Sequence, residues 1–392
     1  MSFGHQRNDS RLILLREIAA AGRVARIDLA QRTGISRATV TTITADLLRD
    51  GLIAEVPVSL QAVRGRPRVD LKLNGASHLV AGVKVSNSWL SVVLMDFAGT
   101  ERAGRRLDVP PGRHTPDALA ALISDGVAEV LAGEGLEPSA LSAVGIGLSG
   151  IIDAGTGHVH WSPSLTLRNV DMWEPLEQVF GVPVHIDNDA NLVAVAERRF
   201  GLARGRDNFI VVTVEAGVGM GLMLGGEIYR GARGAGAEFG HTKVHLEGAL
   251  CRCGQRGCLE AYVADYALER EGRTLLGDGP DVLQRLLGAA QSDPAAATIV
   301  DRAGRMFALG LANLVNLFDP EVIILAGEAL RFEHLYADAV MAEIAKSTVQ
   351  MGGAAPEVLI HPQDRGLWAR GAAAFALDHV MEDAAQGNTR AG

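Results

Sequence analysis

The sequence predicts an α/β protein in which a small N-terminal helical module precedes a larger two-lobed body. Apolar residues recur at helical spacing in residues 9–50, and two short strand-like runs follow them. Strand and helix patterns then alternate in two successive sets, over residues 79–200 and 209–381. All three cysteines of the chain lie close to His241, within residues 237–260. These observations predict a winged helical module, two α/β lobes and a metal site.

The composition is that of a globular protein with an uneven charge distribution. A length of 392 residues predicts two or three domains, and 48% apolar residues suffice for well-formed cores. The net charge is −9, but residues 1–73 carry twelve basic and seven acidic side chains, which gives them +5 and leaves −14 for the rest. This asymmetry predicts that only the N-terminal module meets a polyanion.

The apolar runs predict no membrane contact. The N-terminal residues MSFGHQRNDS contain no apolar stretch of signal-peptide length. No later run approaches the roughly 18 uninterrupted apolar residues of a membrane-spanning helix. We therefore expect a cytoplasmic protein.

The N-terminal module is predicted to contain three helices. The first runs from Asp9 to Gly22, the second covers residues 27–33, and Ser36 caps a third that ends near Asp50. Two short helices joined by a glycine-containing turn form a helix-turn-helix, whose second helix enters a major groove of DNA.

The outward positions of the third helix carry short or hydrogen-bonding side chains, which suit base edges and phosphates. A plain three-helix bundle has the same periodicity, but the local basic excess favours DNA binding. The predicted DNA contacts of this helix are Ser36, Arg37, Ala38, Thr39, Thr41 and Thr42.

Two runs after the helices, 52–58 and 69–73, are predicted to pair as a wing. Between them, Arg64, Arg66 and Arg68 flank a glycine and a proline that keep the segment extended. Such a loop is often a solvated linker, but directly after a helix-turn-helix it is suited to a narrow minor groove.

The body is predicted to form two α/β lobes, with a cleft between them that is a common place for a small ligand. The first set of elements contains strands 79–85, 90–95, 143–148 and 182–186 and helices 115–131 and 190–200. The second contains strands 209–214, 322–326 and 356–360 and helices 296–317 and 332–347, before a last helix over 367–381. The predicted domains are a DNA-binding domain with a basic linker (1–74), a first lobe (75–190, completed by helix 367–382), a second lobe (191–366) and a disordered tail (383–392).

The cysteine-containing stretch predicts a metal site. Three thiols and one imidazole, from Cys251, Cys253, Cys258 and His241, are the ligand set of a closed tetrahedral zinc site. Ordinary buried thiols would not gather in one stretch, and a disulfide would leave one cysteine over. Because four protein ligands leave no open position, we expect the zinc to be structural.

Four motifs resemble those of the ROK family of repressors, open reading frames and kinases, and in particular its sugar-responsive transcriptional repressors. The resemblance covers nearly the whole chain. The motifs are DNDAN from Asp187, GVGMGL from Gly217, GEIYRGARGAGAEFGH from Gly226 and CRCGQRGCLE from Cys251.

The resemblance implies an actin-like, hexokinase-type fold for the body, zinc on the four ligands named above, and a sugar in the cleft. The sugar ligands that it implies are Asn188, Asp189, Glu238, His241 and Glu260. Carboxylates and amides suit sugar hydroxyls because they accept and donate hydrogen bonds in fixed directions. His241 would serve both zinc and sugar through its two ring nitrogens. The bland alternatives are a helix cap for Asn188 and Asp189 and a solvated surface for the two glutamates.

The resemblance also implies that the phosphate-binding loops of the family's kinases are altered here. In those kinases the residue matching Asp189 is the general base. The first phosphate motif, Asp-x-Gly-Gly-Thr, is replaced by residues 84–88, which begin with Lys84, and Gly-Thr-Gly becomes Glu215–Ala216–Gly217. The later Gly-Gly is Ala326–Gly327. We expect no nucleotide cofactor and no enzymatic activity.

We therefore predict a DNA-binding transcriptional repressor, switched by a monosaccharide or sugar derivative in the interlobe cleft. The alternative is an ATP-dependent sugar kinase that carries a DNA-binding arm. The expected partners are operator DNA, the sugar effector and further copies of the chain, as a homodimer or homotetramer. The family's Ser-Pro-Asn-Leu reads Ser-Pro-Ser-Leu here, at residues 162–165, so the sequence leaves the identity of the sugar open.

Overall fold

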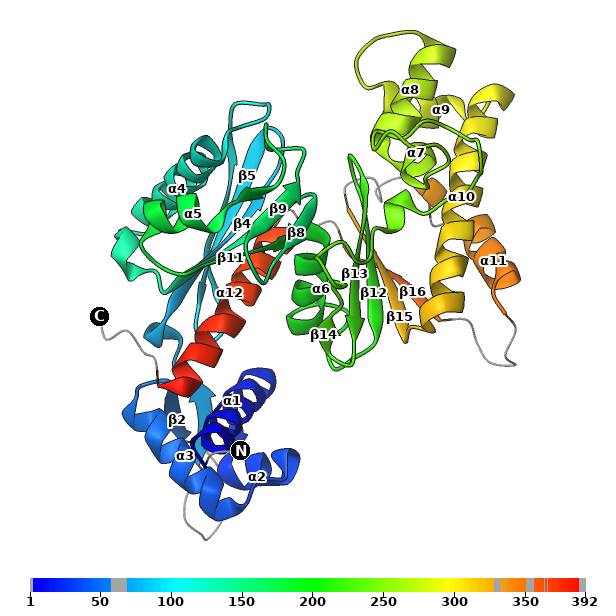
Figure 1. Cartoon of the computed structure of the whole chain (residues 1–392). Coiled ribbons are helices and arrows are strands. Elements are labelled where there is room, and N and C mark those ends of the chain that lie inside the picture. Colours follow the sequence, from blue (N-terminus) through cyan, green and yellow to red (C-terminus); the bar gives the residue numbers. More distant parts are fainter. Residues whose placement is uncertain are drawn as a thin grey trace. The chain divides into compact units, whose positions relative to one another are not determined.

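The computed structural model describes residues 3–57, 69–327, 333–335, 337–349, 356–362, 364 and 366–387 (Figure 1). The chain forms two compact units. The first unit is Met1–Arg199 together with Gly366–Gly392, and the second unit is Phe200–Arg365.

The N-terminal module is a winged helix-turn-helix, as predicted. Leu14, Leu29, Val40 and Leu47 are fully buried and form its core. Strand β1 was not predicted, because two residues give no periodicity to detect; β1, β3 and β2 form one antiparallel sheet. The predicted contacts Arg64, Arg66 and Arg68 lie outside the described residues. The elements are α1 (Phe3–Ala21), β1 (Val24–Ala25), α2 (Arg26–Thr33), α3 (Arg37–Arg49), β2 (Ile53–Pro57) and β3 (Val69–Leu73).

The rest of the first unit is built on a five-stranded sheet in the order β11-β7-β4-β5-β6. Strands β4, β5 and β6 are antiparallel, whereas β7 and β11 run parallel to β4 and to each other. The elements are β4 (Leu79–Val85), β5 (Trp89–Asp96), β6 (Glu101–Asp108), α4 (Pro116–Gly133), β7 (Ala143–Leu148), β8 (Ile151–Asp153), β9 (His158–Trp161), β10 (Val170–Asp171), α5 (Trp173–Phe180), β11 (Val184–Asn188), α6 (Asp189–Arg199) and α12 (Leu367–Gln386).

Helix α12 lies directly on this sheet and extends to the N-terminal module (Figure 1). Two strand glycines make the close approach possible. A Cβ atom at Gly82 would lie 2.1 Å from the carbonyl oxygen of Ala369, and one at Gly145 would lie 1.9 Å from that of Ala372. The predicted disordered tail is therefore wrong over residues 383–386, which are helical. Contact with α1 explains the extra turn, since the Arg11 guanidinium donates to the carbonyl oxygen of Ala384.

The second unit repeats the same sheet topology, in the order β14-β13-β12-β15-β16, with an antiparallel meander followed by two parallel strands. The helix predicted over 332–347 begins later than expected, at Asp338, because the backbone at Ala337 is not helical. The elements are β12 (Phe209–Val214), β13 (Val218–Leu224), β14 (Glu227–Ile228), α7 (Glu260–Val263), α8 (Asp265–Leu276), α9 (Val282–Ala289), α10 (Pro294–Phe318), β15 (Val322–Ala326), α11 (Asp338–Ser347) and β16 (Glu357–Ile360).

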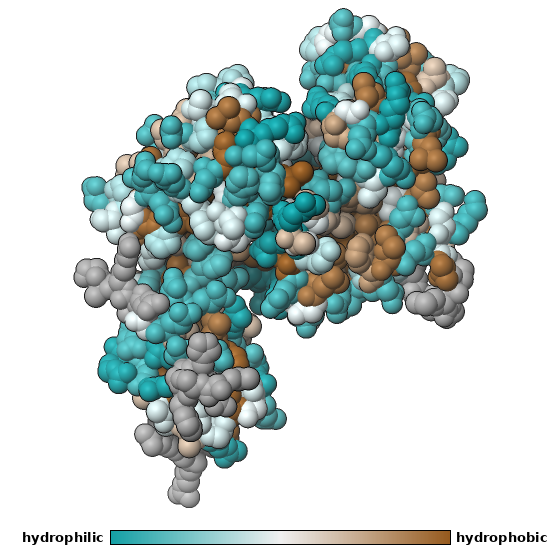
Figure 2. All heavy atoms as spheres, in the orientation of Figure 1, coloured by the Kyte–Doolittle hydropathy of each residue, from teal (hydrophilic) through white to brown (hydrophobic). Residues whose placement is uncertain are grey.

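The visible surface is mostly hydrophilic, with hydrophobic side chains along α10 (Figure 2). Leu309 and Leu317 of this helix are 39% and 74% exposed. Within the described residues, no helix combines the length and the apolar character needed to cross a membrane.

Candidate functional site

Helix α3 presents the predicted DNA-contacting residues on its open face. Gly34 ends α2 with a φ of 70°, and the Ser36 hydroxyl accepts a hydrogen bond of 3.2 Å from the Thr39 amide, which confirms the predicted cap. Val40 and Ile43 face the core. All six predicted contacts are exposed, namely Ser36, Arg37, Ala38, Thr39, Thr41 and Thr42.

A hollow of about 690 Å³ lies between α1 and this face of α3. Arg7 and Ser10 of α1 line it, together with Ala38, Thr39 and Thr42 of α3. Arg7 and Ser10 were not predicted to line this face, because they precede the helix-turn-helix pattern.

Asp46 fixes the position of Arg7 beside α3. The two side chains form an ion pair, and Arg49 donates a second hydrogen bond of 2.7 Å to the same carboxylate. The hydrogen bond from Arg7, with that from Arg49, outweighs burial and lowers the pKa of Asp46. An exposed guanidinium is thereby held next to the helix that is predicted to read DNA.

The metal ligands predicted in the second unit lie together. The side-chain donor atoms of His241, Cys251, Cys253 and Cys258 all lie within 4.8 Å of one another. The sulfur atoms of Cys253 and Cys258 are 3.7 Å apart, and Cys251 Sγ lies 3.7 Å from His241 Nδ1. Tetrahedral zinc with bonds of about 2.3 Å to sulfur separates two sulfurs by about 3.8 Å, so the cluster fits such an ion.

The loop that carries the cysteines depends on a glycine. Gly257 has a φ of 78°, and a Cβ atom there would lie 1.9 Å from the carbonyl oxygen of His245. Any side chain at this position would therefore displace the turn that precedes Cys258.

The chemistry of the thiols also suits a cation. The three cysteines are free, so the alternative of a disulfide is not what the structure shows. Burial raises the pKa of Cys251 to about 12, so this thiol needs a cation beside it to ionise. Lys243 Nζ lies 2.9 Å from Cys258 Sγ, and this hydrogen bond raises the pKa of Lys243. A lysine charge would partly balance three thiolates around a divalent ion.

The acidic residues predicted to bind sugar in the second unit border this cluster. His241 Nδ1 faces the cysteines, and His241 Nε2 lies 3.9 Å from a carboxylate oxygen of Glu238. The two ring nitrogens thus point in different directions, as a residue shared between metal and sugar requires. Glu238 is 38% exposed at its side chain, whereas Glu260 is only 9% exposed.

Glu260 is fixed on both oxygens. Its Oε2 accepts a long hydrogen bond of 3.4 Å from the Val218 amide, and its Oε1 lies 3.3 Å from the hydroxyl of Tyr266. The same hydroxyl lies 3.7 Å from the sulfur of the predicted metal ligand Cys251. Tyr266 therefore connects the metal cluster with a residue assigned to the sugar, and no sequence motif marked it.

In the first unit, Asn188 caps helix α6. Its Oδ1 accepts hydrogen bonds from the amides of Ala190 and Asn191, at 2.8 and 3.3 Å. Its Nδ2 donates to the carbonyl oxygen of Gly150 at 2.9 Å. The capping role that the sequence left open is therefore confirmed, and one N–H of the amide remains for a ligand.

Asp189, the first residue of α6, forms an ion pair with Lys84 of β4. The Ser149 hydroxyl donates a hydrogen bond of 2.6 Å to the same carboxylate oxygen. Burial raises the pKa of Asp189, but the charge and hydrogen bond of Lys84, with Ser149 and the Ala190 amide, hold it below its ordinary value. A carboxylate neutralised in this way is a weak base, which is unsuited to deprotonating a hydroxyl.

Lys84 and Ser149 were not identified as partners of Asp189, because 105 and 40 residues separate them from it in the chain. One signal was present in the sequence. Lys84 interrupts the apolar run of a strand, and a lysine in such a place needs a buried partner.

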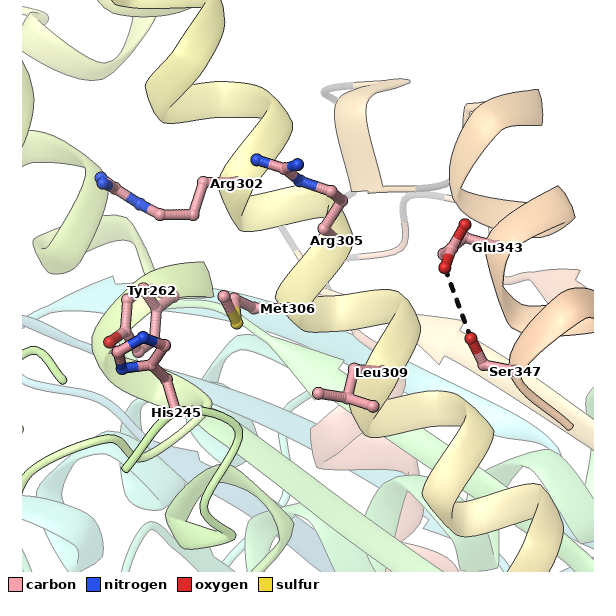
Figure 3. A pocket seen from close by; sticks show the side chains of 8 residues that line it. All are labelled: His245, Tyr262, Arg302, Arg305, Met306, Leu309, Glu343 and Ser347. Atoms are coloured by element: carbon pink, nitrogen blue, oxygen red, sulfur yellow. Dashed lines mark hydrogen bonds between the residues drawn. The ribbon is translucent and has the colours of Figure 1, made fainter. Parts of the chain in front are cut away.

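A further pocket of about 560 Å³ lies in the second unit, against α10 (Figure 3). Arg302 in its wall forms an ion pair with Glu271, and the Ser347 hydroxyl lies 3.5 Å from Glu343. The pocket is lined by none of the residues predicted to bind sugar or metal. Its lining is His245, Tyr262, Arg302, Arg305, Met306, Leu309, Glu343 and Ser347.

Comparison with known proteins gives matches over both parts of the chain. The ROK family model matches residues 80–379, and a model of winged helix-turn-helix DNA-binding domains matches residues 7–54. The chain is 26% identical to the xylose repressor of Bacillus subtilis (strain 168), over 94% of this chain and 95% of that protein. It is 28% identical to the DNA-binding transcriptional dual regulator NagC of Escherichia coli (strain K12), over 78% and 77% of the two chains.

Solved structures agree with this picture. A ROK family transcriptional regulator, described as a homologue of the E. coli MLC protein, matches with a TM-score of 0.81 at 23% identity and covers 98% of both chains. ROK sugar kinases match over 76% or 77% of this chain. The predicted fold class, a winged helix-turn-helix followed by a hexokinase-type body, is therefore confirmed.

Proposed function

Because the chain belongs to the ROK family and carries an N-terminal winged helix-turn-helix, we propose that it is a repressor whose operator affinity is switched by a monosaccharide or sugar derivative. The observation that carries this function is the full-length similarity to a named repressor, which includes the DNA-binding module as well as the body. ROK kinases match the body without adding any counterpart of that module.

The proposed sugar ligands lie in both units. Asn188 and Asp189 belong to the first unit, and Glu238, His241 and Glu260 belong to the second. In support, Asp189 and Glu260 are held by neighbouring donors, and His241 directs one nitrogen away from the metal cluster. Carboxylates fixed in this way select hydroxyl groups by direction.

The proposed metal is a structural zinc ion on His241, Cys251, Cys253 and Cys258. The spacing of the donor atoms and the absence of a disulfide support this assignment. When bound, the ion supplies a rigid link among the loop segments and no reaction chemistry, because four protein ligands complete its coordination. The loop segments that the ion links would in turn hold Glu238, His241 and Glu260 in position.

A kinase is the alternative function, and the altered phosphate loops argue against it. Lys84 stands where the family's kinases have an acid and instead neutralises Asp189. Glu215 lies in the β12–β13 turn, where a carboxylate would repel a triphosphate. A coupled assay of ATP turnover with several hexoses separates the two functions, because a repressor shows no sugar-dependent turnover.

The assembly is proposed to be a homodimer or homotetramer. A two-fold operator requires paired recognition helices about one helical turn apart, roughly 34 Å. An operator-binding protein acts on chromosomal DNA, so we propose a cytoplasmic location. Light scattering of the purified chain measures its oligomeric state, and a monomer would contradict the paired arrangement.

A thermal-shift screen against a panel of sugars tests the proposed effector site. Xylose and N-acetylglucosamine are natural members of the panel, because relatives are named as repressors for these two sugars. A sugar that binds only the folded chain raises its melting temperature by mass action. A panel without any stabilising sugar would contradict the proposed function.

A further inference from the structure

Strand β4 of the first unit carries a buried lysine. Lys84 is only 2% exposed and lies between Val83 and Val85 in the middle of the sheet, with Ser91 and Gly147 as its neighbours on the adjacent strands. Burial of an ammonium group is costly unless a partner of opposite charge is provided. The fold supplies this partner from another element.

The partner of Lys84 is Asp189, at the start of α6. The Nζ atom of Lys84 pairs with Oδ2 of Asp189, and the indole ring of Trp368 lies 5.6 Å from the same Nζ. The side chain of Asp189 is 15% exposed, compared with 3% for Lys84. The lysine therefore lies beneath the carboxylate, on the side away from solvent.

The hydrogen bonds of Asp189 occupy most of the acceptor positions of its carboxylate. Oδ2 accepts from Lys84 and from the Ser149 hydroxyl, and Oδ1 accepts from the Ala190 amide at 3.0 Å. A carboxylate offers about four acceptor positions, so about one remains, and it lies on Oδ1. This remaining position can accept a hydrogen bond from a donor such as a sugar hydroxyl.

We propose that Lys84 is a positioning residue of the effector site, which keeps Asp189 ionised and directs its last acceptor position toward a hydroxyl group of an uncharged sugar. The inference rests on the proposed function, since it assigns a role to Lys84 within the same site. It also explains why the family's general base is retained in a protein that transfers no phosphate: the carboxylate recognises the hydroxyl without removing its proton.

The pH dependence of sugar affinity distinguishes positioning from simple structural support. In the unchanged chain Asp189 stays ionised through mild acid, so Asp189 itself adds no pH dependence to the affinity between about pH 5 and pH 8. In Lys84→Met, burial is no longer opposed by a cation, and the carboxylate takes up a proton in mild acid. Sugar binding that needs the carboxylate should then be at least about fivefold weaker at the lower pH.

The experiment is calorimetric titration at several pH values with the sugar found by thermal shift. The exposed Lys72→Met is the matched control and should behave as the unchanged chain does. A Lys84→Met profile as flat as that of the control would overturn the inference while the proposed function stands. Absence of sugar binding by the unchanged chain would overturn both.

A second variant keeps the test valid if Lys84→Met does not fold. The pair Lys84→Met and Asp189→Asn removes both charges together, which avoids an unpaired buried carboxylate. This double variant should bind the sugar at least about tenfold more weakly at every pH, because a fixed anionic acceptor is lost. Unchanged affinity would overturn the inference, since Asp189 would then have no part in recognition.

Discussion

Tyr266 contacts both the proposed metal cluster and the proposed sugar ligand Glu260 in the second unit. Its hydroxyl lies within 3.3 Å of Glu260 and 3.7 Å of Cys251, and Arg252 stacks on its ring at 3.8 Å. Tyr266→Phe should weaken sugar affinity about fivefold, equivalent to about 1 kcal/mol, because Glu260 loses one hydrogen bond.

Calorimetric titration measures this effect, and Tyr262→Phe is the matched control. The hydroxyl of Tyr262 also takes part in a hydrogen bond, but its partner is the Ala249 amide, at 2.8 Å, and not Glu260. Equal losses in the two variants would show that Tyr266 acts only on stability.

A substitution of Cys253 tests the proposed metal cluster directly. Cys253→Ser should lower the metal content, lower the melting temperature and weaken sugar binding by about tenfold or more, because the loop that carries the sugar ligands loses its anchor. Metal analysis, thermal melting and titration of the same sample check the three effects, with the exposed Gln255→Ala as a neighbouring control. Sugar affinity that survives complete metal removal would exclude the link between metal and sugar.

At the residue scale, the sequence predicted that the four proposed metal ligands lie together, but it did not predict their neighbours. His241 and the cysteines are close in the chain and follow a recognisable spacing, so their convergence was predictable. Lys84 reaches Asp189 only through the pairing of β4 with β7 and the placement of α6. Contacts of this kind depend on the tertiary fold, which single-sequence periodicity does not contain.

At the scale of elements, α12 carries an aromatic cluster with β11. The rings of His185 and His379 stack at 3.9 Å with an angle of 10° between their planes. Burial, together with the charge of His379, lowers the pKa of His185 to about 4 against the opposing charge of Glu382.

This shift predicts the direction in which stability depends on pH. The unfolded chain binds a proton at His185 near pH 6.5, above the folded pKa, so the contribution of His185 is complete above about pH 6.5 and is lost as pH falls toward 4. Between pH 7 and pH 5 the loss is about 2 kcal/mol. Urea unfolding at the two pH values should show a smaller loss in His185→Phe than in the His158→Gln control. An identical loss in both variants would contradict the assignment.

Helix α3 offers a prediction on DNA binding. Arg37, exposed at the first position of the helix, is expected to contact a phosphate group. Arg37→Ala should weaken binding to all sequences alike and reduce the slope of log affinity against log salt by about 1. Fluorescence anisotropy at several salt concentrations measures the slope, with the exposed Arg113→Ala as control. A slope equal to that of the control would show that Arg37 does not reach the DNA backbone.

At this scale, the sequence predicted those elements whose apolar pattern is clear. The strands Ala143–Leu148, Phe209–Val214 and Val322–Ala326 were predicted with their observed bounds, because every residue in them is buried. Strand β6 was missed, since its sequence ERAGRRLD lies mostly exposed at the edge of the sheet. The end of α12 was missed because its burial depends on α1.

At the scale of the whole molecule, the two units contain sheets of the same strand order, and the N-terminal module belongs to the first of them. The ion pair of Arg16 with Glu382, at 2.8 Å, joins α1 to α12. The alternation of strands and helices made the α/β class predictable. The attachment of the DNA-binding module to α12 was not, because those residues are separated by most of the chain.

A sugar-responsive repressor requires that a sugar bound by the body changes operator affinity. The direct measurement selects DNA from a random pool with the purified chain, then follows its binding by anisotropy while a sugar identified by thermal shift is added. The dissociation constant for the selected DNA should change by about tenfold or more at saturating sugar, as expected for a coupling of about 1.4 kcal/mol. DNA affinity that is indifferent to every sugar bound by the chain would contradict it.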